Sequence, residues 1–449
     1  MSRSGIVPVI AASLPAIMAT FMYACPLPAD AAEYTTTMSA ADKDDVWDGM
    51  LTVRYEWLLR QSSISREYAC DATEAGCPSD GGVVRRSEVD SSRMSHRMDI
   101  DGRIGLYKDF ELFFTLPFVL ADQTELSFSP GVSRANSTVF PDAGPALFEL
   151  PDAGKARKGF GDMRVGLKYA PMNQFRNHHH PTLFLSLMYT APTGGVRRAN
   201  SEGVGEGLHK IRFDIGASRR IKFADPYFGL HAEYRTGAGA AGTMFRDWDA
   251  DTQKYTAPGP EVGLKAGVEF YIWNPPLDNR EPERFATLDI GFSARYIFDG
   301  REYTDLFDAL ATSACAGDAS CVSPNSTKNL MAYDRTRDGR VQPITWMDGI
   351  TDVSAYGIFG TWLGINVSPI KYVSLGFRFS YAYETGHFLT NASIGRNLDS
   401  TNGNIELTNV DGRNEFNPVF NSDVDSPGNR FYSEGAHNYG IFLTLSGKY

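Results

Sequence analysis

The sequence lacks two features, and each absence excludes a class of protein. After its first thirty residues it has no long apolar run, and its mean hydropathy is −0.27. A membrane-spanning helix needs about 20 consecutive apolar residues, so a bundle of such helices is excluded. Positive charge is not in excess either: the 449 residues carry 43 basic and 54 acidic side chains, a formal net charge of −11. A nucleic-acid partner is excluded as well, because binding to phosphates requires a basic surface.

Cysteine is scarce, with 5 in the chain. One, Cys25, directly follows the N-terminal apolar segment, and the other four form two close pairs, Cys70 with Cys77 and Cys315 with Cys321. Neither pair has the Cys-x-x-Cys spacing of a zinc site, and no histidine lies beside either pair. We therefore expect two local disulfides in an oxidising compartment. The sequence predicts no metal site and no cofactor.

Residues 1–31 have the composition of a secretory signal. Arg3 supplies the positive start, 6–24 is apolar and uncharged, and Ala29-Asp30-Ala31 is a small-x-small cleavage site. An uncleaved membrane anchor is the alternative, and prolines within the segment disfavour it. We assign 1–31 to a signal peptide, 32–46 to a short periplasmic N-terminal segment and 47–449 to one folded unit.

That unit shows period-2 alternation of apolar and polar residues. In 51–55, for example, Leu51, Val53 and Tyr55 alternate with Thr52 and Arg54. A helical period would not separate the two faces in this way. The pattern occurs twelve times, with short joins alternating with long ones such as 61–93, 121–159, 299–352 and 385–436. It predicts an all-β fold, a closed antiparallel transmembrane β-barrel of about 12 strands with long extracellular loops.

Two features favour a membrane barrel over a soluble sandwich. The apolar faces end in aromatic residues such as Trp57, Tyr189 and Tyr439, as expected where rings meet lipid headgroups. The opposite faces carry charges at mid-strand, which is typical of an aqueous lumen. The chain ends on Tyr449, similar to the C-terminal signal read by the bacterial barrel-assembly machinery. We predict the bacterial outer membrane as the location, with its lipid and the assembly machinery as partners.

The candidate lumen-lining residues are the charged residues of the polar faces and one histidine. They are Arg54, Glu56, Arg97, Asp99, Asp101, Arg103, Arg164, Lys168, Arg212, Asp214, His231, Glu233, Arg235, Lys265, Glu269, Asp289, Arg295 and Arg378. Rings of charge in a pore tune ion selectivity. Because both signs alternate, paired charges that simply fill a narrow lumen are the alternative.

The sequence does not predict an enzyme. Barrel lipases pair a serine nucleophile with a histidine base, often as His-x-Ser on one strand face. That motif is absent, and Ser95 and His96 are adjacent, so they point to opposite faces. His231 shares the polar face with Glu233, but no serine lies beside it. No catalytic residue is predicted.

Three segments within 109–195 carry a family resemblance. They are Glu111-Leu-Phe-Phe-Thr-Leu-Pro-Phe118, Gly159-Phe-Gly-Asp-Met-Arg-Val-Gly-Leu-Lys-Tyr169 and Tyr189-Thr-Ala-Pro-Thr-Gly-Gly195. They resemble a porin-like family of outer-membrane transporters associated with the meta-pathway of phenol degradation. The resemblance implies a channel or transporter for passive passage of small solutes, hydrophobic or aromatic ones among them. The alternative is a structural or adhesive surface barrel with a plugged lumen and partner-binding loops.

Overall fold

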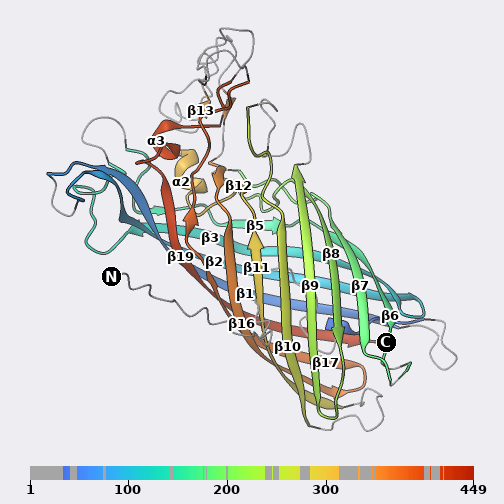
Figure 1. Cartoon of the computed structure of the whole chain (residues 1–449). Coiled ribbons are helices and arrows are strands. Elements are labelled where there is room, and N and C mark those ends of the chain that lie inside the picture. Colours follow the sequence, from blue (N-terminus) through green and yellow to red (C-terminus); the bar gives the residue numbers. More distant parts are fainter. Residues whose placement is uncertain are drawn as a thin grey trace, which may run out of the picture.

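Twelve antiparallel strands close into a barrel in the computed structural model (Figure 1). In order around the wall they are β1 (Gly49–Cys70), β2 (Gly82–Tyr107), β3 (Phe110–Phe128), β6 (Arg164–Met172), β7 (Thr182–Thr190), β8 (Leu208–Ser218), β9 (Ala224–Gly237), β10 (Glu261–Trp273), β11 (Phe285–Ile297), β16 (Tyr356–Ile370), β17 (Val373–Glu384) and β19 (Phe431–Lys448). The last strand pairs with the first, from Met50 opposite Lys448 to Arg66 opposite Phe431. The predicted fold class is confirmed.

The described part of the chain has gaps. It comprises residues 34–40, 48–73, 77–140, 146–174, 176–177, 179–198, 201–237, 245, 252–273, 284–312, 332–333, 345–346, 349–398, 405, 415–417 and 419–449. The predicted signal peptide and the predicted Cys315–Cys321 disulfide lie outside these residues. Across the described ranges, no helix has the length and apolar character to cross a membrane.

The barrel wall has an apolar outer face and a polar inner face. On β1, Leu51 is 54% exposed, whereas Thr52 and Arg54 are 2% and 1% exposed. This follows from the strand itself, because successive side chains point to opposite sides of a sheet. Large apolar side chains such as Phe213 and Leu363 continue the exposed outer band on β8 and β16. Lipid requires a closed sheet with such an outer surface, and the chain is an outer-membrane β-barrel.

The two ends of the barrel differ as the pattern of joins predicts. At one end the turns are short: Lys108 and Asp109 join β2 to β3, and Lys371 and Tyr372 join β16 to β17. At the other end the strands run into long loops (Figure 1). We refer to these as the periplasmic and extracellular ends, following the usual arrangement of outer-membrane barrels.

The prediction of a loop over 61–93 is wrong. The β1–β2 hairpin continues past Gln61, which pairs with Ser92, up to Cys70, which pairs with Gly82, with one shift of register between Ile64 and Ser65. Lipid does not cover this upper part of the hairpin, so the apolar alternation that marks a membrane strand is lost there. Ile64 instead points inward and is fully buried among loop residues.

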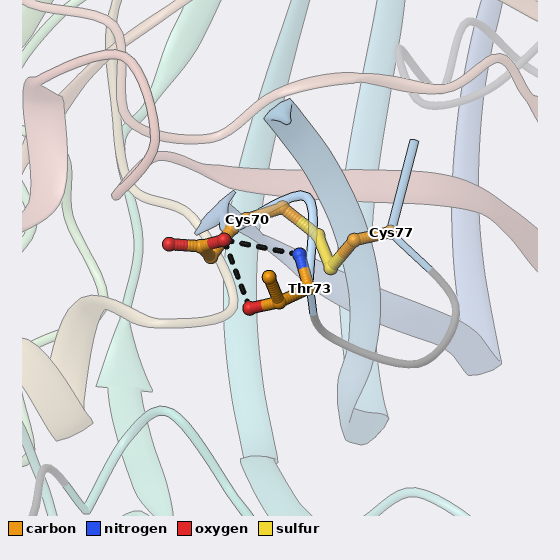
Figure 2. Close-up of a disulfide and its surroundings, with 4 residues drawn as sticks. Cys70, Thr73 and Cys77 are labelled. Carbon is orange, nitrogen blue, oxygen red and sulfur yellow. Dashed lines mark hydrogen bonds between the residues drawn. A yellow bond between two sulfur atoms is a disulfide. The ribbon is translucent and has the colours of Figure 1, made fainter. Parts of the chain in front are cut away.

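A disulfide closes the tip of this hairpin, as predicted. Cys70 and Cys77 are bonded, and the carboxylate of Asp71 accepts hydrogen bonds from the backbone N–H and the hydroxyl of Thr73, each at 3.0 Å (Figure 2). The short loop thus has two local constraints.

The extracellular loops fold into a cap with its own apolar core. The short elements at this end are β4 (Asp152–Ala153), β5 (Arg157–Phe160), β12 (Gly300–Glu302), α2 (Phe307–Thr312), β13 (Ala332–Tyr333), β14 (Thr345–Trp346), β15 (Thr351–Val353), β18 (His387–Phe388) and α3 (Ser422–Asp425). The buried core of the cap comprises Ile64, Val89, Leu126, Val139, Leu147, Phe148, Leu150, Leu306, Ala309, Leu310, Leu389, Ala392, Phe416, Val419, Val424 and Phe431. Residues from three separate loops and four strands meet there, so the loops stabilise one another.

One cap residue, Asp425, is a buried carboxylate at the end of α3. Burial raises the pKa of Asp425 to about 7, although the backbone N–H groups of Asn421 and Ala392 hydrogen-bond to it and oppose the shift. Of the charged groups that face it, Asp352 raises the pKa further and Arg301 lowers it. Asp425 therefore favours the folded cap in its neutral form.

The cap should be less stable at alkaline pH than at acidic pH. Because the folded pKa of Asp425 lies above the unfolded one, the stabilisation is complete below about pH 4 and is lost as pH rises through about 7. We expect proteolytic cleavage within 389–431 to be roughly tenfold or more faster at pH 8 than at pH 5.5. Asp425→Asn should abolish this difference, whereas the same change at its exposed neighbour, Asp423→Asn, should preserve it. An equal pH dependence in both variants would rule Asp425 out as the cause.

Candidate functional site: the barrel lumen

Asp99 on β2 is the centre of one cluster of buried charges. Its carboxylate accepts hydrogen bonds from Arg54 at 3.0 Å, Arg97 at 2.7 Å and Arg164 at 2.7 Å. Asp99 is fully buried. Three strands, β1, β2 and β6, therefore contribute guanidinium groups to one carboxylate inside the barrel.

Glu261 on β10 is the centre of a second cluster. It accepts hydrogen bonds from Arg235 at 2.5 Å and Arg295 at 3.0 Å, and it lies 3.1 Å from His231. Sequence reasoning missed Glu261, because the predicted strand began one residue later. Extending the alternation of Lys265 and Glu269 back along the chain would have found it.

Asp289 on β11 is the centre of a third. Arg378 donates to its carboxylate at 2.9 Å, the indole N–H of Trp362 donates at 2.7 Å, and the hydroxyl of Tyr227 donates at 2.8 Å. These donors come from β17, β16 and β9, so one carboxylate again joins several strands.

The structure gives the other predicted lumen residues similar surroundings. Most of them form ion pairs: Glu56 and Asp101 with Arg54, Arg103 with Glu111, Arg212 with Asp214, and Glu233 with Arg235. Glu269 is buried. Lys168 and Lys265 contact the N-terminal segment.

Glu111 is a second inward-facing residue that sequence reasoning missed. It alternates with Phe113 and Thr115 on the inward face of β3, whose outward face alone was considered.

The N-terminal segment, Tyr34–Ala40, lies within the periplasmic half of the lumen. Lys168 donates hydrogen bonds to the carbonyl oxygens of Tyr34 at 3.0 Å and Thr36 at 2.6 Å, and Arg103 donates to Thr36 at 2.6 Å. The backbone N–H of Met38 donates to Glu111 at 2.7 Å. Charged wall residues thus bind the backbone of this segment.

The ring of Tyr34 has a pocket in the wall. The Lys265 ammonium lies 2.9 Å from the ring centroid, and the Phe184 ring packs edge-on at 5.0 Å. Two glycines make room for the ring, because a Cβ added at Gly229 would lie 1.9 Å from the Tyr34 hydroxyl and one at Gly216 would lie 3.0 Å from the ring. Tyr34 is consequently buried, at 5% exposure.

A chamber of about 340 Å³ lies in the extracellular half of the lumen. Charges of both signs line it, together with the rings of Tyr303 and Tyr356. The charged residues are Arg97, Arg164, Lys210, Arg235 and Arg295 with Asp162, Glu206, Glu233, Glu261 and Glu302. The two lists are equal in number, so the chamber does not select strongly for one sign of charge.

Ion pairs join the segment around α2 to residues at the extracellular end of the barrel. Asp308 accepts two hydrogen bonds from Arg157, at 2.8 and 2.6 Å, and Asp305 pairs with Arg60. Burial opposes ionisation of Asp305, but the Arg60 guanidinium and the Ser62 hydroxyl outweigh it and lower the pKa of this carboxyl. Charge-assisted hydrogen bonds to Arg60 and Arg157 therefore hold the segment that carries α2 at this end of the barrel.

The three segments of the family resemblance meet beside the chamber. Asp162 accepts the backbone N–H of Gly194 at 2.9 Å and that of Glu206 at 3.0 Å, and Gly161 donates its N–H to the carbonyl of Pro117 at 2.8 Å. The aspartate of the Gly-x-Gly-Asp segment thus holds the Pro-Thr-Gly loop in place. In this chain its contacts are structural.

The two histidines considered for catalysis have other partners. His231 lies 3.1 Å from Glu261, not beside Glu233, which pairs with Arg235. The Nδ1 of His96 hydrogen-bonds to the Tyr55 hydroxyl at 2.7 Å on the outer wall. Among the described residues, no three His, Cys, Asp or Glu side chains are grouped closely enough to hold a metal ion. The absence of enzymatic activity stays a prediction.

The comparison with solved structures finds distant similarity to outer-membrane proteins. No protein-family model matches the sequence, and no curated protein matches it. Among solved structures, an outer-membrane channel of Pseudomonas putida F1 is 11% identical with a TM-score of 0.43, covering 94% of this chain and 100% of its own. A FadL homologue of Pseudomonas aeruginosa is 9% identical with a TM-score of 0.30 (90% and 90%), and the outer-membrane protease OmpT of Escherichia coli is 9% identical with a TM-score of 0.25 (89% and 97%). These likenesses are too distant to identify a family, and the membership suggested by the three motifs stays a prediction.

Proposed function

We propose that this protein is an outer-membrane channel for the passive passage of small solutes. The chamber in the lumen, with charges of both signs, is the observation that supports it. In the conformation described here, Tyr34–Ala40 lies below the chamber and the segment around α2 lies above it. We infer that this is the closed state, and that movement of the N-terminal segment opens it.

The lining favours solutes that carry charge or hydroxyl groups. A hydrocarbon in the chamber would bury arginine and carboxylate groups without replacing their water, which is costly. The family resemblance implies small solutes that include hydrophobic or aromatic ones. Polar and aromatic solutes should be compared in the same experiment, because the chamber lining favours the first and the motifs favour the second.

Reconstitution of the purified barrel tests the proposal. We expect discrete conductance steps in planar bilayers, since ions of either sign can pass a lumen of mixed charge. In liposome swelling, we expect glycine, a zwitterion, to enter faster than benzoate, an aromatic anion. The reverse order would support the aromatic solutes of the resemblance. Bilayers that stay silent, together with liposomes that do not swell, would refute the channel.

A surface barrel with a plugged lumen is the second candidate. It is favoured by one observation, the extensive pairing of the inward charges around Asp99, Glu261 and Asp289. In this case the folded cap, not the lumen, would carry the function, by binding partners. Silent bilayers would support this reading.

A further inference from the structure

The outer wall changes abruptly from apolar to polar near the middle of β1 (Gly49–Cys70). Leu59 pairs with Tyr439 on one side and with Met94 on the other, and this row is apolar. Two residues further along, Gln61 pairs with His437 and Ser92. The edge of the hydrocarbon layer therefore lies between these two rows. Only the apolar row of Leu59 can face lipid without an energetic cost.

A groove of about 910 Å³ lies on the polar side of this boundary. We call it the outer-wall groove; it is lined by Ser63, Asp90, Ser92, Glu125, Glu434 and His437, among others. The strand register places the first four in consecutive rows, since Ser63 pairs with Asp90 and Ser92 pairs with Glu125. The groove thus extends across β1, β2 and β3 on the outside of the barrel, and it includes residues of β19.

The lining of the groove suits a partner rich in hydroxyl groups. Asp90 accepts hydrogen bonds from the hydroxyls of Ser63 and Ser129, each at 3.0 Å, so this part of the groove is already organised around hydroxyl donors. Hydroxyl groups can both donate to carboxylates and accept from serines. The rings of Tyr383 and His437, with centroids 5.5 Å apart, add an apolar face of the kind on which a sugar ring packs.

The same lining disfavours phosphate. None of the described residues that line the groove is Lys or Arg, whereas its carboxylates include Asp90, Glu125, Asp152 and Glu434. These groups would repel an anionic group placed inside the groove. A sugar ring whose own charged substituents stay outside the groove meets no such barrier.

We propose that the outer-wall groove binds the sugar headgroup of a glycolipid in the outer leaflet of the membrane. The groove begins one outward row above the apolar row of Leu59, Met94 and Tyr439, where a headgroup anchored by acyl chains is present at high local concentration. This inference does not depend on the proposed channel, because the groove lies on the outer wall and the paired charges lie inside.

Thermal unfolding of the wild-type barrel in detergent gives the first test. Rough lipopolysaccharide and dioleoyl phosphatidylglycerol are both anionic and both carry acyl chains, but only the first carries sugars. A ligand that binds only the folded state raises the unfolding temperature. We expect a clear rise with lipopolysaccharide and little change with phosphatidylglycerol. Equal effects of the two lipids would overturn the proposal.

Filling the groove gives the second test. Ser63→Phe with Ser92→Phe places two rings in the groove on strand positions that accept aromatic residues. The variant should lose most of the lipopolysaccharide that co-purifies with the barrel and keep its single-channel conductance. Thr236→Phe is the matched control, because Thr236 is an exposed hydroxyl residue at the extracellular end of β9, away from the groove.

Full retention of lipopolysaccharide by the filled variant would contradict the proposal. If the variant does not fold, as judged by heat-modifiable mobility on gels, the comparison of the two lipids on the wild-type protein decides alone. A change in conductance without a change in lipid retention would concern the channel and leave the groove unsupported.

Discussion

Replacing Tyr34 with alanine should raise the conductance of the reconstituted barrel severalfold. The Tyr34 ring fills a pocket between Lys265, Phe184 and Tyr227, with centroid distances of 5.0 and 5.8 Å to the two rings. Losing a buried aromatic ring removes a few kcal/mol of packing, by analogy with about 3–5 kcal/mol for large-to-small changes in cores. The remaining hydrogen bonds to the segment then compete with water, and the segment should leave the lumen more often.

A substitution in the barrel wall should also displace the Tyr34 ring. Gly229→Val would place a side chain where the Tyr34 hydroxyl now lies, since even a Cβ there would be 1.9 Å away. It should expel the ring and raise the conductance as Tyr34→Ala does. Tyr234→Ala is the control, because this ring lies on the outer wall and is 60% exposed. If both lumen variants conduct like the wild type, the N-terminal segment is not the closing element.

The barrel itself could be predicted because lipid imposes a simple rule on every strand. Leu51 must face lipid and Arg54 must not, so apolar and polar residues alternate along the sequence of each strand. Once a strand rises above the lipid the rule no longer applies. This is why alternation predicts a loop from residue 61, although the backbone pairing continues to Cys70.

The contacts of the N-terminal segment could not be predicted. The sequence predicts a short periplasmic segment over 32–46 and no contacts for it. The binding partners of Tyr34–Ala40, such as Lys168 and Gly229, lie on strands distant in the chain. Seven residues without periodicity carry no signal for such contacts. Two unremarkable glycines, Gly216 and Gly229, gain their role only when the barrel closes around a ring.

For the inward-facing charged residues, the sequence likewise predicts one property and not another. That Asp99 and Arg164 belong to polar strand faces follows from alternation. That they form an ion pair at 2.7 Å across a sequence separation of 65 residues depends on the register of β2, β3 and β6. Alternation gives the face of each residue, whereas register gives its partner, and only the structure supplies register.

Substituting Asp99 should test how much of the stability depends on the paired charges. Asp99→Asn keeps the shape of the side chain but removes the negative charge shared by Arg54, Arg97 and Arg164. Breaking a buried ion pair by changing one partner costs about 3–5 kcal/mol, because the other charge stays buried without compensation. We expect a loss of this size in the free energy of unfolding, measured by urea titration of the barrel in lipid vesicles.

An exposed ion pair is the control for the change in unfolding free energy. Glu149 pairs with Arg134 at 2.6 Å, and the two side chains are 43% and 61% exposed. Glu149→Gln should therefore cost less than about 1 kcal/mol, as exposed pairs do. If Asp99→Asn costs as little as Glu149→Gln, water must screen the Asp99 cluster, and the lumen is wetter than its packing indicates. A large cost would instead mean that the cluster is dry, so that solutes must pass through the chamber beside it and not through the cluster itself.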